Sequence, residues 1–231
     1  AYAGLYKALN TSEEERLQQV LSRLKRREPL QYILGSMRFM EHTFHVAPGV
    51  LIPRPETEDL VKRVLHTYNR DDAPFLMDVG TGSGCIAISL KLAMPKAHVM
   101  GIDISDEALC QARANAKNLH ADVDFYMADV LKPYCLSPTK VDALVSNPPY
   151  VRRSEMQEMD AQVKDYEPHE ALFVPDSSPL VFYEALAKWG KNLLNANGHI
   201  FVEINSALGP ETAALFKSYG YLDVIVETDQ F

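Results

Sequence analysis

The tetrad Asn147-Pro148-Pro149-Tyr150 is the part of the sequence whose residue types most restrict the chemistry. Proline fixes its own φ and keeps the preceding residue out of the helical region, so we expect Asn147 in a stiff, extended loop. The Asn147 side-chain oxygen and the Pro148 carbonyl can each accept one N–H bond of a planar NH₂ group, with Tyr150 as a flat wall. This predicts catalysis by positioning and electrostatic stabilisation, with the nitrogen lone pair aimed at a methyl donor. Asn-Pro is also a common turn signal, and a plain turn after a strand is the alternative.

A glycine-rich loop at residues 78–84, Asp-Val-Gly-Thr-Gly-Ser-Gly, follows an apolar run and opens a helical one. Glycines permit a tight turn and let a ligand approach the backbone. Asp103 lies about twenty residues further on, where a carboxylate can accept both hydroxyls of a ribose. The sequence therefore predicts a nucleoside-containing cofactor, and two kinds stay open. Residues 82–87 satisfy the dinucleotide fingerprint G-x-G-x-x-A, whereas an acidic residue before alternating glycines is typical of S-adenosylmethionine sites.

Asp129 and Val130 follow the third expected strand and can complete the nucleoside pocket. Asp129 or the adjacent backbone can meet an adenine amino group while Val130 packs on the ring. An aspartate after a strand is also typical of a helix cap or a solvated loop. The predicted cofactor contacts are Asp78, Gly80, Thr81, Gly82, Ser83, Gly84, Asp103, Asp129, Val130 and Asn147.

The elements that position these motifs are short apolar runs alternating with helical patterns. Strands spaced by helices imply a doubly wound, mostly parallel sheet, whose strands present their carboxyl ends at one edge. Residues 151–178 match neither period and predict a lid over the site. The expected strands are 75–79, 98–102, 123–127, 141–146, 199–204 and 221–227, and the expected helices 85–92, one capped by Ser105, 179–194 and 210–218.

The amino-terminal part differs in charge and pattern. Residues 1–55 hold eight Lys/Arg against five Asp/Glu, a net of +3, whereas residues 56–231 have a net of −11. Ser12 and Glu15 form a capping box ahead of an apolar stripe at Leu17, Val20, Leu21 and Leu24. A hairpin is expected within residues 33–50. We predict a helical domain with a hairpin at residues 1–52, used for partner recognition, and a catalytic domain at residues 53–231.

Net charge, cysteine spacing and the length of apolar runs indicate what kind of protein this is and where it works. The overall net charge of −8 argues against a general nucleic-acid or membrane surface. Three cysteines without a C-x-x-C pair are typical of a reducing compartment, and no apolar run is long enough for a bilayer, so we expect a cytoplasmic protein. His42 and His45 fall on opposite faces of a strand, and no metal is expected. The chain begins at Ala1 rather than Met, which suggests a piece of a longer protein.

With these motifs in view, the chain resembles the HemK/PrmC-type protein-(glutamine-N5) methyltransferases over nearly its whole length. The resemblance rests on the loop 78–84, Asp103, the N-P-P-Y tetrad, and three runs at residues 29–35, 51–58 and 167–172: P-L-Q-Y-I-L-G, L-I-P-R-P-E-T-E and E-P-H-E-A-L. It implies a seven-stranded-type sheet, S-adenosylmethionine as methyl donor and S-adenosylhomocysteine as product. The implied substrate is the glutamine of the Gly-Gly-Gln motif in class 1 peptide-chain release factors. The amino-terminal part is shorter than the family's, and the chain ends where a seventh, antiparallel strand is expected.

Two other activities stay open at this point. One is N-methylation of an exocyclic amine in DNA or RNA, which needs a basic groove that the acidic residues 56–231 do not suggest. The other is an NAD-dependent oxidoreductase. Arg54 and Glu56 form either an interdomain ion pair or part of the substrate wall together with the tetrad. We expect a monomer.

Overall fold

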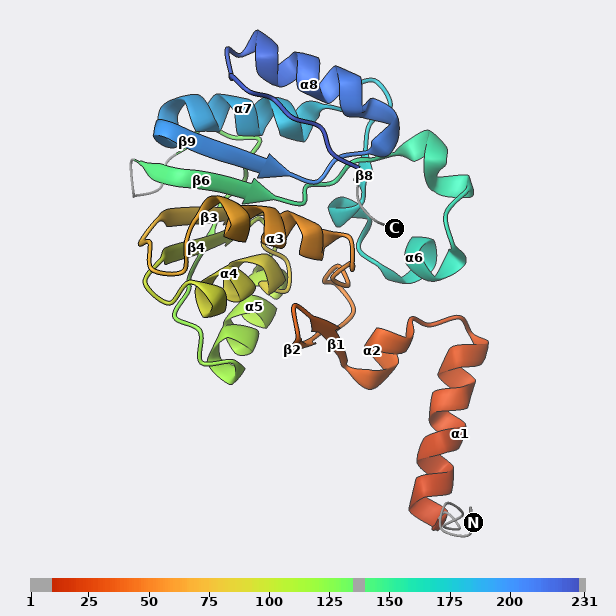
Figure 1. The fold of residues 1–231 in the computed structure, drawn as a ribbon. Coiled ribbons are helices and arrows are strands. Elements are labelled where there is room, and N and C mark those ends of the chain that lie inside the picture. The colour runs from red at the N-terminus through yellow and green to blue at the C-terminus, as the bar shows by residue number, and fades with distance from the viewer. Residues whose placement is uncertain (1–9, 135–139, 229–231) are drawn as a thin grey trace, which may run out of the picture.

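A five-stranded parallel sheet forms the centre of the molecule, in the order β5-β4-β3-β6-β9 (Figure 1). The structure is a computed structural model that describes residues 10–134 and 140–228. The order begins in the middle, at β3, and runs outward in both directions, which is the doubly wound arrangement expected from the alternating pattern. The strands of this sheet are β3 (Phe75–Val79), β4 (His98–Asp103), β5 (Asp124–Met127), β6 (Val141–Ser146) and β9 (Leu194–Val202).

Helices cover both faces of the sheet (Figure 1). On one face, α3, α4 and α5 share a core with alternate strand residues such as Leu76 and Val99. On the other face, α7 packs on the intervening residues such as Met77 and Met100, and α8 packs on α7. Successive strand residues thus enter opposite cores, as the period of two requires. The helices are α3 (Thr57–Thr67), α4 (Cys85–Ala93), α5 (Asp106–Asn118), α7 (Val181–Leu193) and α8 (Gly209–Ser218).

Helix α1 (Thr11–Lys25) begins two residues earlier than a cap at Ser12 predicts. Asn10, not Ser12, is the N-cap: its side chain accepts from Glu13 N at 2.9 Å, and the Glu13 carboxylate accepts from Asn10 N at 2.9 Å. The prediction of a capping box at Ser12 and Glu15 was therefore wrong. The observed box, Asn10 and Glu13, has the same spacing of three residues. Within residues 10–134 and 140–228, no element buries the apolar stripe of α1, and the helix projects from the body of the molecule (Figure 1).

A short helix and a hairpin join α1 to the sheet domain. Helix α2 (Leu30–Leu34) starts after Pro29, and strands β1 (Ser36–Phe39) and β2 (His42–His45) form the expected hairpin. Phe39 and Phe44, buried on one face of the hairpin, pack edge to face within the same core as α3, α4 and α5. The hairpin is therefore packed into the core that α3, α4 and α5 form with the sheet, whereas α1 is not.

Residues 151–178, which follow the tetrad and match neither a helical nor a strand period, contain short helices and strands. This connection contains β7 (Val151–Arg152), a 3₁₀ turn (Arg153–Gln157), α6 (Ala161–Tyr166), a second 3₁₀ turn (His169–Ala171) and β8 (Phe173–Val174). Strands β7 and β8 pair in parallel. Tyr166 Oη donates to Arg26 O at 2.7 Å, so the connection reaches the end of α1. Its role as a lid stays a prediction.

The last expected strand is absent. Residues 221–227 form no strand, because Asp223 has a positive φ of 52° and Leu222 and Ile225 are exposed, without a pairing partner. Tyr221 instead donates to Ala187 O, and Glu227 forms an ion pair with Arg63. Strand β9 also begins five residues before the expected start at residue 199. Among the helices in the described ranges, none has both the length and the apolar character needed to cross a bilayer.

Candidate active site

The predicted motifs converge at the carboxyl edge of the sheet. The glycine loop follows β3, Asp103 ends β4, and the tetrad follows β6. Ser146 Oγ donates to Val79 O at 2.6 Å and thereby ties the end of β6 to the end of β3. Because parallel strands end at one edge, residues about seventy apart in sequence become neighbours there.

The glycine loop has the strained conformation that its sequence predicts. Gly80, Gly82 and Gly84 all have positive φ angles, of 77°, 55° and 81°. This is the left-handed region that residues with a side chain rarely enter. At Gly84 space is limiting as well, because an added Cβ would lie 2.8 Å from Ile88 Cδ1 and 3.1 Å from Ala112 Cβ. The third glycine thus allows α4 to approach α5.

Asp103 is connected to the loop by its own carboxylate. Gly82 N donates to Asp103 Oδ2 at 2.8 Å, and Ser105 N donates to Oδ1 at 2.9 Å. Burial raises the pKa of Asp103, and these backbone donors act in the opposite direction. Both oxygens are therefore fixed in place by backbone groups, which orients their remaining lone pairs. This is the arrangement needed to accept two hydroxyls of one ribose.

Asp78 is buried beneath the loop. Its Oδ2 accepts from Thr81 Oγ1 at 2.6 Å and from Ala87 N at 3.2 Å, whereas Oδ1, within the described residues, has no hydrogen-bond partner. Burial raises its pKa to about 7, although the Thr81 and Ala87 bonds lower it. A buried carboxylate oxygen without a donor suits a cationic ligand group, such as the ammonium of a methionine moiety. Thr81 and Ser83 have buried side chains and support the loop from within.

Asp129 is already partly engaged by its own turn. Its Oδ1 accepts from Leu131 N at 2.9 Å, and Oδ2 lies 3.5 Å from Lys132 Nζ. Val130 is partly buried against the core that α7 covers. Asp129 therefore stabilises a turn at residues 130–131 rather than capping a helix, and contact of Asp129 or Val130 with an adenine stays a prediction.

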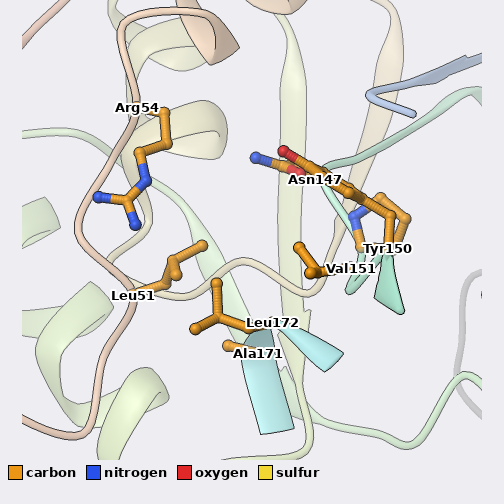
Figure 2. A pocket seen from close by; sticks show the side chains of 8 residues that line it. Leu51, Arg54, Asn147, Tyr150, Val151, Ala171 and Leu172 are labelled. Atoms are coloured by element: carbon orange, nitrogen blue, oxygen red, sulfur yellow. The ribbon is translucent and has the colours of Figure 1, made fainter. Parts of the chain in front are cut away.

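The tetrad forms one wall of a small pocket of about 30 Å³. Figure 2 shows Asn147 and Tyr150 on one side and Arg54 with Leu51 on the other. Asn147 is partly exposed at this pocket and Pro148 is buried behind it. The lining residues are Leu51, Arg54, Asn147, Pro148, Tyr150, Val151, Ala171 and Leu172.

Two residues behind the tetrad were not predicted from sequence. Asn147 Nδ2 donates to Thr57 Oγ1 at 3.0 Å, and Thr57 Oγ1 donates to Glu203 Oε2 at 2.7 Å. Tyr150 Oη donates to the other oxygen of Glu203 at 2.9 Å. The position of Glu203, directly after a strand at the same sheet edge, was a signal that could have identified it. Thr57 lies at the first position of α3, within the run that follows Pro55.

Arg54 pairs with Glu167 rather than with Glu56. The Arg54 Nη2 atom lies 2.6 Å from Glu167 Oε1, and Ile52 N donates to Glu167 Oε2 at 3.1 Å. The Glu167 side chain is 1% exposed, so the connection after the tetrad is fixed to the segment before α3 by a buried carboxylate. Glu56 is the N-cap residue of α3, and its contact with substrate stays a prediction.

A parallel doubly wound sheet with an acidic glycine loop, a ribose-type carboxylate and an N-P-P-Y tetrad defines a Rossmann-like, S-adenosylmethionine-dependent methyltransferase. A solved structure of ribosomal protein L11 methylase from Lactobacillus delbrueckii subsp. bulgaricus has the same fold, with a TM-score of 0.55 and 19% identity over 80% of this chain and 79% of that chain. Residues 57–164 match the family model "Methyltransferase small domain", and residues 2–35 match "PrmC N-terminal domain".

Curated relatives narrow the class to one family. The chain is 45% identical over 230 residues to the release factor glutamine methyltransferase of Bacteroides thetaiotaomicron, covering 100% of this chain and 82% of that protein. It is 41% identical to the enzyme of the same name from Flavobacterium psychrophilum, over 91% of this chain and 74% of the relative. The chain belongs to the family of release factor glutamine methyltransferases.

Proposed function

We propose that this enzyme methylates the side-chain amide nitrogen of the glutamine in the Gly-Gly-Gln motif of class 1 peptide-chain release factors. The observation that carries the proposal is the Asn147 carboxamide, which Thr57 Oγ1 holds through Nδ2 at the wall of a pocket shared with Leu51 and Arg54. S-adenosyl-L-methionine supplies an electrophilic methyl group on a sulfonium, and S-adenosyl-L-homocysteine is its product. Family membership and the edge-of-sheet location of the motifs support the same activity.

The cofactor is proposed to bind along the glycine loop. Asp103 accepts the ribose hydroxyls, because two backbone donors already orient its carboxylate. Asp78 provides the free, buried oxygen for the ammonium group. Asp129 and Val130 border the adenine end. This assignment gives the ribose hydroxyls and the ammonium group of the methyl donor acceptor partners.

The substrate amide is proposed to be held by the tetrad. Asn147 Oδ1 and the Pro148 carbonyl each accept one N–H of the glutamine NH₂ group, which fixes the nitrogen and directs its lone pair. Pro149 stiffens the loop, and Tyr150 forms the flat wall. Arg54 and Leu51 close the pocket on the other side. These residues position the nitrogen, and the mechanism requires no covalent intermediate with the protein.

A nucleic-acid amine is the less favourable substrate. Proteins that bind nucleic acid neutralise its phosphates with Lys and Arg, whereas residues 56–231 have a net charge of −11 and would repel a phosphate backbone. We further propose that residues 1–52, with their net charge of +2, take part in recognising the release factor. The catalytic domain then comprises residues 53–231, and the enzyme acts as a cytoplasmic monomer.

The proposal is tested by mass spectrometry. Purified release factor, incubated with the enzyme and isotopically labelled S-adenosylmethionine, should gain one methyl group on the glutamine of its Gly-Gly-Gln tripeptide. Asn147→Ala should reduce the rate of transfer by about 10²- to 10³-fold, because one oriented acceptor is removed. Calorimetry on the same variant should give a nearly unchanged affinity for the cofactor.

Three results bear on the assignment. A release factor that stays unmodified while DNA or RNA is methylated would replace the proposed substrate. Methylation of another residue of the release factor would reject the Gly-Gly-Gln glutamine. Equal losses of transfer and of cofactor affinity in Asn147→Ala would remove Asn147 from its assigned role.

A further inference from the structure

The orientation of the Asn147 side-chain amide, that is, whether Oδ1 or Nδ2 faces the pocket, decides whether the tetrad can hold an NH₂ group. A primary carboxamide has an acceptor oxygen and a donor nitrogen of nearly equal size, and rotation by half a turn exchanges them. Only the orientation with Oδ1 toward the pocket can accept an N–H bond from a substrate amide. Building on the proposed function, we propose that Thr57 and Glu203 are positioning residues that select this orientation of Asn147.

A chain of hydrogen bonds carries the inference. Asn147 Nδ2 donates to Thr57 Oγ1 at 3.0 Å, and the Thr57 hydroxyl donates to Glu203 Oε2 at 2.7 Å. Thr57 is 2% exposed, so its hydroxyl has no access to bulk water as an alternative partner. The three groups come from the loop after β6, the first turn of α3 and the residue after β9.

The number of hydrogen atoms available to Asn147, Thr57 and Glu203 determines which group donates and which accepts in each hydrogen bond. An ionised Glu203 can only accept, so the single hydroxyl hydrogen of Thr57 is committed to it. Thr57 then offers only lone pairs to Asn147, and the Asn147 group that faces Thr57 must be the NH₂. Rotating the amide would place Oδ1 against the Thr57 oxygen and leave two acceptors in contact. In a buried site that arrangement costs the free energy of an unpaired polar group.

Glu203 is held as an acceptor by groups on several elements. Tyr150 donates to its Oε1, and Tyr183 on α7 donates to its backbone carbonyl at 3.2 Å. Burial raises the pKa of Glu203, as does Glu56, whereas the Thr57 and Tyr150 bonds and the charge of Arg54 lower it. The pKa of Glu203 is raised overall, so its acceptor role rests on geometry: a hydroxyl donor, Thr57 or Tyr150, lies on each of its two carboxylate oxygens. Glu203 also orients both ends of the tetrad at once, through Thr57 and through Tyr150.

The kinetic test compares three single substitutions at the two threonines that begin and end α3. Thr57→Val keeps the shape of the side chain and removes both hydrogen bonds, whereas Thr57→Ser keeps the hydroxyl. Thr67→Val is the matched control, since Thr67 ends α3 on the surface and its hydroxyl donates only to Arg63 O. We expect Thr57→Val to lower kcat for release-factor methylation by about 10- to 100-fold, with an S-adenosylmethionine Kd within about twofold of wild type. Thr57→Ser and Thr67→Val should stay within about threefold of the wild-type kcat.

A second measurement needs no substrate. In a ¹H–¹⁵N NMR spectrum, the side-chain NH₂ signal that disappears in Asn147→Asp identifies the Asn147 amide. Its protons should exchange slowly with solvent in the wild type and in Thr57→Ser, and rapidly in Thr57→Val. A folded Thr57→Val with wild-type kcat, or with equally slow exchange, overturns the inference, as does a Thr57→Ser as defective as Thr57→Val. If the wild type fails to methylate release factor, the proposed function is wrong, while the exchange data still decide the orientation of Asn147.

Discussion

The Glu167 carboxylate should be the most important single polar group for holding the substrate wall together. It accepts from Ile52 N at 3.1 Å and from Arg54 Nη2 at 2.6 Å, while its own side chain is 1% exposed. Glu167→Ala removes both bonds. Hydrogen bonds to a charged group contribute about 1.5–3 kcal/mol each, which gives about 3–6 kcal/mol for two. Arg54 is 28% exposed and can regain water, so we expect a loss of about 3 kcal/mol in the free energy of unfolding.

Urea denaturation measures this loss. Trp189 is the single tryptophan and is 4% exposed in the core under α7, so its fluorescence reports unfolding of the catalytic domain. With an m value near 3 kcal/mol/M, the midpoint should fall by about 1 M. Because Leu51 and Arg54 line the pocket, the KM for release factor should also rise.

A nearby glutamate provides the control. Glu170 is exposed in the turn three residues further along, and Glu170→Ala should change the free energy of unfolding by no more than about 0.5 kcal/mol. A loss below about 1 kcal/mol for Glu167→Ala, or an equal loss for Glu170→Ala, would refute the reasoning. An Arg54→Ala/Glu167→Ala double-mutant cycle with no coupling energy would refute the ion pair specifically.

Two further predictions concern the cofactor loop. Asp103→Ala should weaken S-adenosylmethionine binding by more than tenfold in calorimetry while the fold stays intact, and an unchanged Kd would remove Asp103 from the site. The pKa of Asp78 is raised to about 7, so the cofactor-free fold binds a proton that the unfolded chain has released. Its contribution to stability is therefore full below about pH 4 and is lost as the pH rises to about 7, by at most about 4 kcal/mol. Asp78→Asn should flatten this part of the pH–stability curve, and a variant whose curve matches the wild type would contradict the assignment.

The strands and the motifs at their ends were predicted from sequence because their signals are local. The strand predictions for residues 75–79 and 141–146 match β3 and β6 in full, since both strands are buried except for one partly buried residue each, Phe75 and Asp142. The glycine loop was equally clear, because alternating positive φ angles demand glycine wherever the loop occurs. Ser105 caps α5 as expected, accepting from Ala108 N.

Structural predictions were wrong where the local sequence was compatible with two structures, or where the structure depended on a residue far away in the chain. Asn10 and Ser12 each begin a valid capping box, and local sequence does not choose between them. Residues 221–227 have the composition of a strand, but a strand also needs an edge to pair with, and this segment packs near α7 and α3 instead. Of the two alternatives for Arg54 and Glu56, the ion pair does not form, because charges two residues apart gave no information about a carboxylate 113 residues further on. The substrate-wall alternative stays a prediction.

The fold class, the cofactor loop and the tetrad follow from residues that are close in the chain. The residues that support the tetrad and the pocket wall come instead from distant parts of the chain, and folding brings them together. Thr57 and Glu203 are 146 residues apart, and Arg54 and Glu167 are 113 apart. These contacts form because parallel strands and the segment before α3 end at one edge of the sheet, where burial makes an unpaired polar group costly and so selects partners that no local pattern specifies.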